Sequence, residues 1–249
     1  MSQQQHPGTI ALVGSGEYTA AMNETDSFLL ATIITATPTV AVIPTASGLE
    51  GTMPQQWNER GVAHFRALGV KVTPVPLIRR ADAENPEIVA ALQAADFYYF
   101  SGGNPEYLIE TLRDTPAWAA IQSRHQAGAV IAGCSAGAMM LGGATLRVRD
   151  VAQGQPPRWV PAAGVVPQVT VLPHFDRMAS FAGPDLFRQI IASAPAGITL
   201  IGVDEDTALV RQHAAGGAMR WRVMGRQTVS VFAADGSRAL YRAGDVIAL

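Results

Sequence analysis

Cysteine and long apolar runs are scarce in this 249-residue sequence. Cys134 is the only cysteine, which excludes a disulfide within the chain and a cysteine-rich metal site. No uninterrupted apolar stretch reaches about 18 residues, so a transmembrane helix is not expected. The polar start, MSQQQHPG, lacks the apolar segment of a secretory signal. These absences predict a cytoplasmic protein without a membrane partner.

Charge is also scarce. Charged residues make up 15% of the chain and the net charge is −2, whereas hydrophobic residues make up 48%. Lys71 is the only lysine and no block of Lys or Arg occurs, so nucleic acid is not an expected partner. The length and apolar content suit one α/β domain over residues 1–249, with residues 1–7 as a disordered tail; two smaller domains are the alternative.

Short apolar runs alternate with segments of helical spacing. Nearly continuous apolar strands are typical of a parallel sheet covered by helices on both faces, which predicts a three-layer α/β sandwich. Two prolines place the strand at 70–77 on an edge. The predicted strands are residues 9–13, 39–43, 70–77, 96–100, 129–132, 168–172 and 199–203. The predicted helices are residues 55–68, 86–94, 118–126 and 186–192, with another beginning at Pro105.

The pattern changes after residue 143. Residues 147–161 are polar and rich in Pro and Gly, which predicts a loop. From Arg220 onward, polar and apolar residues alternate between glycine-containing turns. This alternation predicts antiparallel hairpins at the edge of the sheet.

Residues 129–143, AVIAGCSAGAMMLGG, predict a strand, a tight turn and a helix. Ser135 lies at the turn, where small neighbours let the strand and the helix approach closely. The helix directs its first free N–H groups at whatever the serine attacks. The bare G-x-S-x-G pattern also fits a glycine-rich turn with an incidental serine. The buried strand before it and the helix after it favour a nucleophile elbow.

A nucleophilic serine needs a base, and His174 is the best placed of the five histidines. A hydroxyl attacks poorly unless a histidine accepts its proton and a carboxylate orients that histidine. His174 directly follows a predicted parallel strand, on the same rim as Ser135; a surface or capping role is the alternative. The remaining histidines lie in the tail, in predicted helices or in a turn: His6, His64, His125 and His213.

Two carboxylates compete for the role of orienting acid. Glu205 ends a predicted strand, and this topology favours it. Asp150 lies in the loop after the elbow and could also reach the histidine. Asp204 and Asp206 are expected to point elsewhere, because side chains alternate along a strand. A solvated carboxylate or a helix cap is the alternative for each.

Two backbone N–H groups are expected to stabilise the anion that forms on attack. Ala136 directly follows the nucleophile. Gly103 lies in a Gly-Gly turn, which lets the backbone approach a substrate closely, although an ordinary strand-end turn explains it equally well.

Three further signals are weaker. The turn at 14–16, Gly-Ser-Gly, lacks the third glycine of a dinucleotide fingerprint, so a nucleotide site is not expected. Cys134 stands one position before the elbow's apex, where a packed side chain is expected rather than a second nucleophile. Arg177 could bind a substrate carboxylate, and a solvated arginine is the alternative.

These motifs together resemble the cyanophycinase and aspartyl dipeptidase family of serine peptidases. That family shares its flavodoxin-like fold with class I glutamine amidotransferases. The resemblance implies Ser135 as nucleophile, His174 as general base and a carboxylate at Glu205, which we prefer, or at Asp150. It covers roughly residues 8–210. Its marks are Gly-Ser-Gly-Glu at 14–17, Gly-Gly-Asn at 102–104, Gly-Cys-Ser-Ala-Gly-Ala at 133–138, His-Phe at 174–175 and the segment 202–209.

The sequence departs from cyanophycinases around the expected substrate pocket. Leu172 and Pro173 precede the histidine where those enzymes have Asp-Gln, and the spaced arginines that follow are reduced to Arg177. Asn104 replaces an acidic residue that is common after Gly-Gly. We therefore expect retained hydrolytic machinery with a different specificity, and substrate contacts from Asn104 and Arg177.

The resulting hypothesis is a serine-type peptidase that cleaves small peptides or isopeptides through an acyl-enzyme, without a metal or another cofactor. One alternative is an esterase of the α/β-hydrolase type, although that fold places its histidine after the acid. A second is a non-catalytic binding or regulatory protein that keeps the fold. A homodimer is left open.

Overall fold

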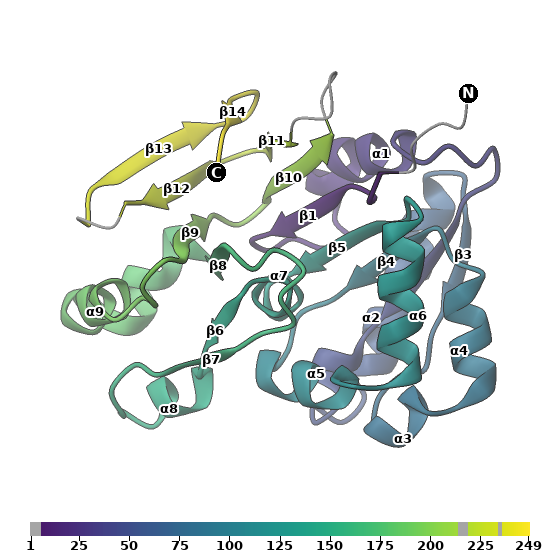
Figure 1. The fold of residues 1–249 in the computed structure, drawn as a ribbon, viewed down its shortest axis with the longest axis horizontal. Coiled ribbons are helices and arrows are strands. Elements are labelled where there is room, and N and C mark those ends of the chain that lie inside the picture. Colours follow the sequence, from purple (N-terminus) through teal and green to yellow (C-terminus); the bar gives the residue numbers. More distant parts are fainter. Residues whose placement is uncertain (1–5, 214–218, 234–235) are drawn as a thin grey trace.

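An eight-stranded sheet forms the centre of the protein, whose structure is a computed structural model that describes residues 6–213, 219–233 and 236–249. The strand order is β14-β11-β10-β1-β5-β4-β2-β3 (Figure 1). The neighbouring strands β1, β5, β4, β2 and β3 are parallel to one another. Strands β10, β11 and β14 are antiparallel to their neighbours. The strands are β1 (Ile10–Val13), β2 (Thr39–Ile43), β3 (Lys71–Pro74), β4 (Phe97–Phe100), β5 (Val130–Cys134), β10 (Thr207–His213), β11 (Met219–Gly225) and β14 (Val246–Ile247).

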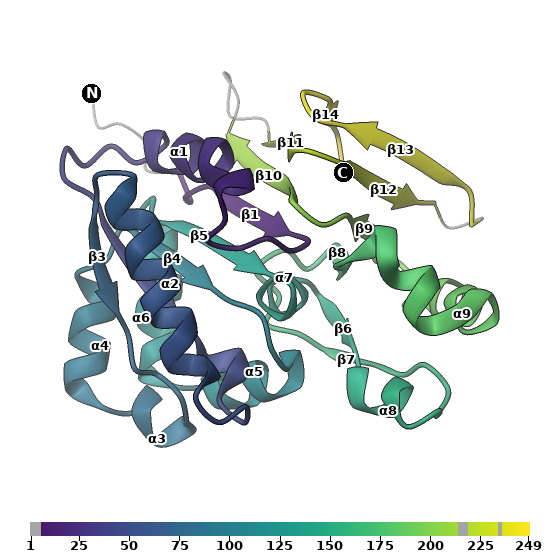
Figure 2. The same ribbon diagram turned by 180° about the vertical axis from the view of Figure 1, so that it is seen from behind.

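Helices cover both faces of this sheet, as the sequence predicts. Along β1, Ile10 and Leu12 belong to one apolar cluster, whereas Ala11 and Val13 belong to the other. Figure 1 shows α4 and α6 in front of the sheet, and Figure 2 shows α1 and α2 over the opposite face. The helices are α1 (Asn23–Ala31), α2 (Met53–Ala67), α3 (Arg80–Ala83), α4 (Pro86–Gln93), α5 (Pro105–Leu112), α6 (Pro116–Gln126), α7 (Ala136–Leu141), α8 (Val148–Ala152) and α9 (Phe175–Ala192), with 3-10 turns η1 (Ala20–Met22) and η2 (Thr45–Ser47).

A smaller sheet lies beside the large one, with the order β13-β12-β9-β8. The sequence predicted β8 and β9 for the same sheet rim as the elbow strand, and that placement was wrong. Antiparallel β10 occupies the edge of β1, so β8 and β9 pair with each other and with β12 instead. The strands are β8 (Val169–Leu172), β9 (Thr199–Val203), β12 (Thr228–Phe232) and β13 (Arg238–Arg242), and a separate ribbon joins β6 (Ala144–Leu146) to β7 (Trp159–Pro161).

Local sequence signals explain where several helices begin. Proline is the first residue of α4, α5 and α6, where its missing N–H costs no hydrogen bond. The residue before each proline caps the helix: the side chains of Asn85, Asn104 and Thr115 accept backbone N–H groups of the first turn. The helix predicted from Pro105 is therefore present.

Other elements differ from the prediction. The expected loop at 147–161 contains α8 and β7, and α1, β6 and β10 had not been predicted. Helix α9 begins at Phe175, whereas the sequence predicted a start at 186. A kink at Gly183 (φ 72°) and Pro184 interrupts the helical pattern, so the sequence did not reveal the first half of the helix. Edge strand β3 and the antiparallel C-terminal hairpins are confirmed. Residues 1–5 of the expected disordered tail lie outside the described residues.

Phe175 fixes the start of α9 against the small sheet. Its ring is 5% exposed and lies next to Gly202 of β9, where an added Cβ would be 2.3 Å from the ring. Phe187 and Phe232 complete the contact, with ring centroids 5.5 and 5.7 Å away. In the part of the chain that is described, no helix is both long and apolar enough to cross a membrane.

Gly202→Ala is expected to lower the free energy of unfolding by about 1–3 kcal/mol, because the methyl group overlaps the Phe175 ring. In a Phe175→Leu background the same change is expected to cost less, since the ring that it meets is gone. Urea unfolding of both single variants and the double variant measures this coupling. Additive losses would contradict the contact.

Candidate active site

Ser135 lies between the end of β5 and the first turn of α7, in a strained backbone conformation. Its φ of 51° and ψ of −111° are unusual for an L-residue. The Ser135 N–H donates to the carbonyl of Val13 at 2.9 Å. A Cβ at Gly133 would lie 2.3 Å from backbone atoms of Gly137, so only glycine lets β5 and α7 approach this closely. This is the geometry of a nucleophile elbow.

His174 stands between Ser135 and Glu205. Its Nε2 is 3.0 Å from Ser135 Oγ, and its Nδ1 is 2.9 Å from Glu205 Oε1. When Nδ1–H donates to the carboxylate, Nε2 is left as the acceptor for the serine hydroxyl. Three segments that are distant in the sequence thus form one hydrogen-bonded chain.

The last residue of β1 and the turn after it, residues 13–17, contact all three of these segments. The carbonyl groups of residues 13–15 accept the N–H groups of Ser135, His174 and Asp206, at 2.9, 3.3 and 3.2 Å. Glycine is required at position 14, because a Cβ there would lie 2.1 Å from the carbonyl oxygen of Asp204. The His174 backbone itself is left-handed, with φ of 48°. These bonds therefore set the relative positions of Ser135, His174 and Glu205.

Neighbouring residues contact both the side chain and the backbone of Glu205. Arg177 Nε lies 2.9 Å from Glu205 Oε2, the oxygen that does not face the histidine. The Glu205 N–H donates to Asp176 Oδ1 at 2.9 Å. The carbonyl of Glu205 accepts from Gln227 Nε2 at 3.0 Å. These contacts orient the carboxylate toward His174.

Asp150, the alternative acid, is engaged elsewhere. Its Oδ2 lies 3.0 Å from Arg158 Nε and 3.5 Å from Arg147 Nε, and Arg147 also pairs with Glu106 at 2.7 Å. The carboxylate that the structure brings to His174 is Glu205. Asp204 also faces away, since its side chain accepts from Thr228 of β12.

The Gly102-Gly103 turn reaches the nucleophile. A Cβ on Gly102 would lie 3.4 Å from Ser135 Cβ and 3.7 Å from Ser135 Oγ. Gly103 has φ of 143°, and a Cβ there would lie 2.4 Å from the backbone of Ala46. Within the described residues, the Gly103 N–H donates to no acceptor. Ala136 is the first residue of α7, so its N–H has no intrahelical acceptor either.

Asn104 and Arg177, the residues expected to contact substrate, each use some of their polar atoms on other protein groups. Asn104 Oδ1 accepts the N–H of Tyr107 at 3.0 Å as the cap of α5, which leaves its amide nitrogen. Arg177 uses Nε on Glu205, while its side chain remains 61% exposed. Asn104 directly follows Gly103, and Arg177 lies three residues after His174.

Glu17 is the residue whose role the sequence did not reveal. Its carboxylate is buried, with Oε1 accepting the Gly102 N–H at 3.0 Å and Oε2 accepting the Cys134 thiol at 2.9 Å. The available signal was its place directly after the glycine turn at 14–16. Burial, followed by the neighbouring Glu17 carboxylate, raises the pKa of the Cys134 thiol well above its ordinary value. The thiol is fully buried, as predicted, and stays protonated at neutral pH.

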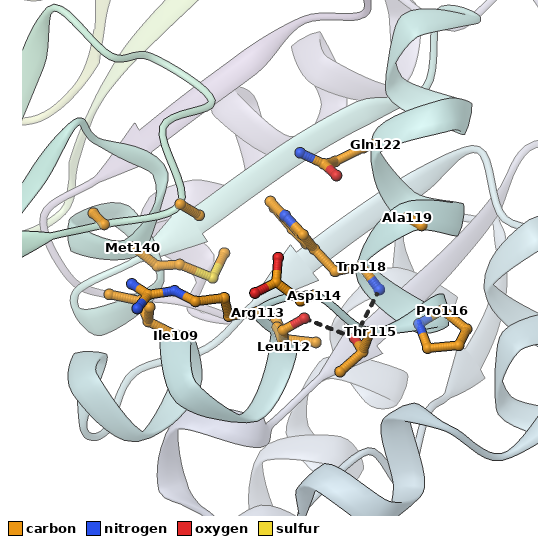
Figure 3. A pocket seen from close by; sticks show the side chains of 12 residues that line it. Ile109, Leu112, Arg113, Asp114, Thr115, Pro116, Trp118, Ala119, Gln122 and Met140 are labelled. Atoms are coloured by element: carbon orange, nitrogen blue, oxygen red, sulfur yellow. Dashed lines mark hydrogen bonds between the residues drawn. The ribbon is translucent and has the colours of Figure 1, made fainter.

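A separate cavity of about 610 Å³ opens between α5, α6 and residues 162–163 (Figure 3). Trp118 and Leu112 line it together with Met140 of α7. None of its lining residues belongs to the Ser135–His174–Glu205 chain. Ser135, His174 and Glu205 therefore do not line this cavity.

Comparisons with known proteins identify the family of this chain. The model of peptidase family S51 matches residues 10–216. The cyanophycinase of Synechococcus elongatus is 32% identical over 200 residues, which cover 77% of this chain and 58% of that protein. A cyanophycinase of Nostoc is 27% identical over 203 residues, which cover 77% and 62%. The chain thus spans less than two thirds of the length of these curated relatives.

Two solved structures extend the likeness to the fold. A peptidase from an acI-B1 actinobacterium is 34% identical, with 99% of both chains covered and a TM-score of 0.87. A Listeria monocytogenes protein assigned to peptidase E is 19% identical, with 89% of this chain and 100% of that chain covered and a TM-score of 0.60, which bears on the fold alone.

Fold and site together define an α/β protein with a Ser-His-Glu arrangement at a nucleophile elbow. The chain belongs to peptidase family S51. The family and the flavodoxin-like fold that the resemblance implied are confirmed.

Cys134 is expected to resist alkylation in the native protein, because its thiol is buried and its raised pKa keeps it from forming the reactive thiolate. Intact mass measured after iodoacetamide treatment checks this, with unfolding in urea as the positive control. Since Cys134 is the only cysteine, any adduct on the folded protein at the rate of a free thiol would contradict its placement.

Proposed function

We propose that the protein is a serine hydrolase that cleaves amide bonds of small peptides or isopeptides through an acyl-enzyme. The observation that carries this proposal is the hydrogen-bonded chain from Ser135 Oγ through the His174 imidazole to Glu205. Such a chain supplies the base that a serine hydroxyl needs at neutral pH, and the carboxylate that keeps the base in the required tautomer.

The reaction proceeds in two halves. Ser135 Oγ attacks the substrate carbonyl while His174 Nε2 accepts the hydroxyl proton, and a tetrahedral anion forms. The anion collapses, and the imidazolium gives its proton to the leaving amine, which leaves an ester on Ser135. Water then attacks the ester, His174 accepts a proton from it and returns the proton to Ser135, and the acid product departs. Glu205 stabilises the transient imidazolium throughout.

Two backbone N–H groups, those of Gly103 and Ala136, are the proposed oxyanion hole. Both flank Ser135, and neither is used within its own turn or helix. Pre-aligned donors at a developing negative charge are commonly the largest single catalytic contribution. This role also accounts for the close approach of the Gly102-Gly103 turn to the nucleophile.

A small peptide or isopeptide is the proposed substrate. The peptidase with 34% identity matches this chain over its whole length, whereas the cyanophycinases are longer. Arg177 retains donors beyond Nε that can bind a substrate carboxylate, and Asn104 retains its amide nitrogen. The cytoplasmic location stays a prediction from the sequence, and a homodimer stays open.

An esterase of the α/β-hydrolase type has less support. In that fold the catalytic order along the chain is serine, acid, histidine, whereas here His174 precedes Glu205. A non-catalytic role is disfavoured by the intact contacts among the three groups.

Ser135→Ala is expected to reduce turnover by roughly a million-fold, because the nucleophile is lost. Amine release from a library of dipeptides and β-aspartyl isopeptides, run beside an ester library, measures the loss and separates peptidase from esterase. Ser123→Ala, at an exposed serine of α6, is the matched control and is expected to keep wild-type activity. Hydrolysis by Ser135→Ala at the wild-type rate would end the proposal.

The acid is tested by a pair of isosteric changes. Glu205→Gln is expected to lower kcat by about 10⁴-fold, because a neutral amide neither holds the histidine tautomer nor stabilises the imidazolium. Asp150→Asn is expected to leave kcat near the wild-type value, because its partners are arginines outside the site. Steady-state kinetics on the best library substrate compares them, and the reverse order would reassign the acid to Asp150.

A further inference from the structure

Glu17 is a buried carboxylate that the proposed mechanism does not use. It lies in the turn after β1 and is buried, with 9% of its surface exposed. Burying a carboxylate is costly unless its oxygens accept hydrogen bonds. Oε1 accepts the Gly102 N–H and Oε2 accepts the thiol of Cys134, the residue just before the nucleophile. The same carboxylate thus joins the two segments that flank the reacting carbonyl in the proposed mechanism.

The Gly102-Gly103 turn needs such an anchor. Two consecutive glycines have the greatest backbone freedom of any dipeptide, so the direction of the Gly103 N–H is not set by local sterics. Glu17 holds the Ser101–Gly102 peptide, and the Asn104 N–H, which donates to the Ala46 carbonyl at 2.7 Å, holds the Gly103–Asn104 peptide. Gly103 is therefore held from both sides.

We propose that Glu17 is a positioning residue that aligns the Gly103 N–H for the oxyanion, by holding Gly102 in register with the nucleophile. The inference rests on the proposed serine hydrolase function. Oxyanion donors must lie within hydrogen-bond distance of an atom that becomes charged only in the transition state. Misplacement by about 1 Å can cost about a hundredfold in rate. A tether between Gly102 and the elbow strand prevents that displacement.

A carboxylate suits this task better than an amide. The two donors are the Gly102 N–H and the Cys134 S–H, and each needs its own acceptor oxygen. A carboxylate has two such oxygens. A glutamine offers one oxygen and presents its NH₂ group to the second donor. The raised pKa of the Cys134 thiol, caused by burial and then by Glu17, keeps that donor protonated.

The test measures inactivation by a fluorophosphonate probe, which needs both an activated serine and the oxyanion hole. Glu17→Gln is expected to lower the first-order inactivation constant by at least about tenfold and at most by about 10³-fold, the upper value for complete loss of an oxyanion donor, with little change in probe binding. Asp26→Asn is the matched control, because Asp26 is also a buried carboxylate but pairs with His64 rather than with Gly102 or Cys134. Asp26→Asn is expected to lose thermal stability and keep the inactivation constant.

A second pair of variants keeps the test decisive if Glu17→Gln does not fold. Cys134→Ala removes the thiol donor and is expected to slow inactivation, and Cys134→Ser restores a donor and is expected to recover part of the rate. A packing role alone predicts no recovery by serine.

The outcomes separate the two proposals. A wild-type protein that reacts, together with Glu17→Gln at an equal rate, would overturn the role of Glu17 and leave the serine hydrolase intact. An equal loss in Asp26→Asn, or no recovery by Cys134→Ser, would likewise reduce Glu17 to a stability role. A wild-type protein that does not react would remove the proposed function and this inference with it.

Discussion

The turn after β1 is the constraint on which the catalytic arrangement depends. Its backbone carbonyl groups, at residues 13–15, hold Ser135, His174 and Asp206, while the Glu17 carboxylate holds Gly102. Hydrogen bonds from a single short segment thus fix four distant parts of the chain. Because buried backbone groups must be paired, a displacement of any one segment leaves an unsatisfied donor or acceptor. Catalytic geometry and stability are therefore coupled at this turn.

Two sheets, rather than one, position the three residues of the candidate site. Ser135 follows β5 of the large sheet, whereas His174 and Glu205 follow β8 and β9 of the small sheet. Antiparallel β10 follows the acid directly and pairs with β1, which brings the end of β9 beside the turn at 13–17. The packing of Phe175 against Gly202 then fixes the first turn of α9 next to the histidine. The active site lies where the two sheets meet.

Much of this could be predicted from local sequence, and the remainder depends on distant packing. The elbow at Ser135 has a strand, small residues and a helix within about ten positions, so its geometry is encoded locally. The choice between Glu205 and Asp150 is not encoded locally, because it depends on which carboxylate the fold brings to His174. Glu17 was missed for the same reason: a lone carboxylate after a turn is ordinarily solvated, and its burial comes from Gly102 and Cys134. The first half of α9 was hidden by its internal glycine and proline.

A crystal structure of the protein after reaction with a phosphonate inhibitor tests the central claim most directly. We expect phosphorus bonded to Ser135 Oγ, with the phosphoryl oxygen within hydrogen-bond distance of the Gly103 and Ala136 N–H groups and Glu17 still bound to Gly102. An adduct on another residue, or a phosphoryl oxygen directed away from both N–H groups, would contradict it.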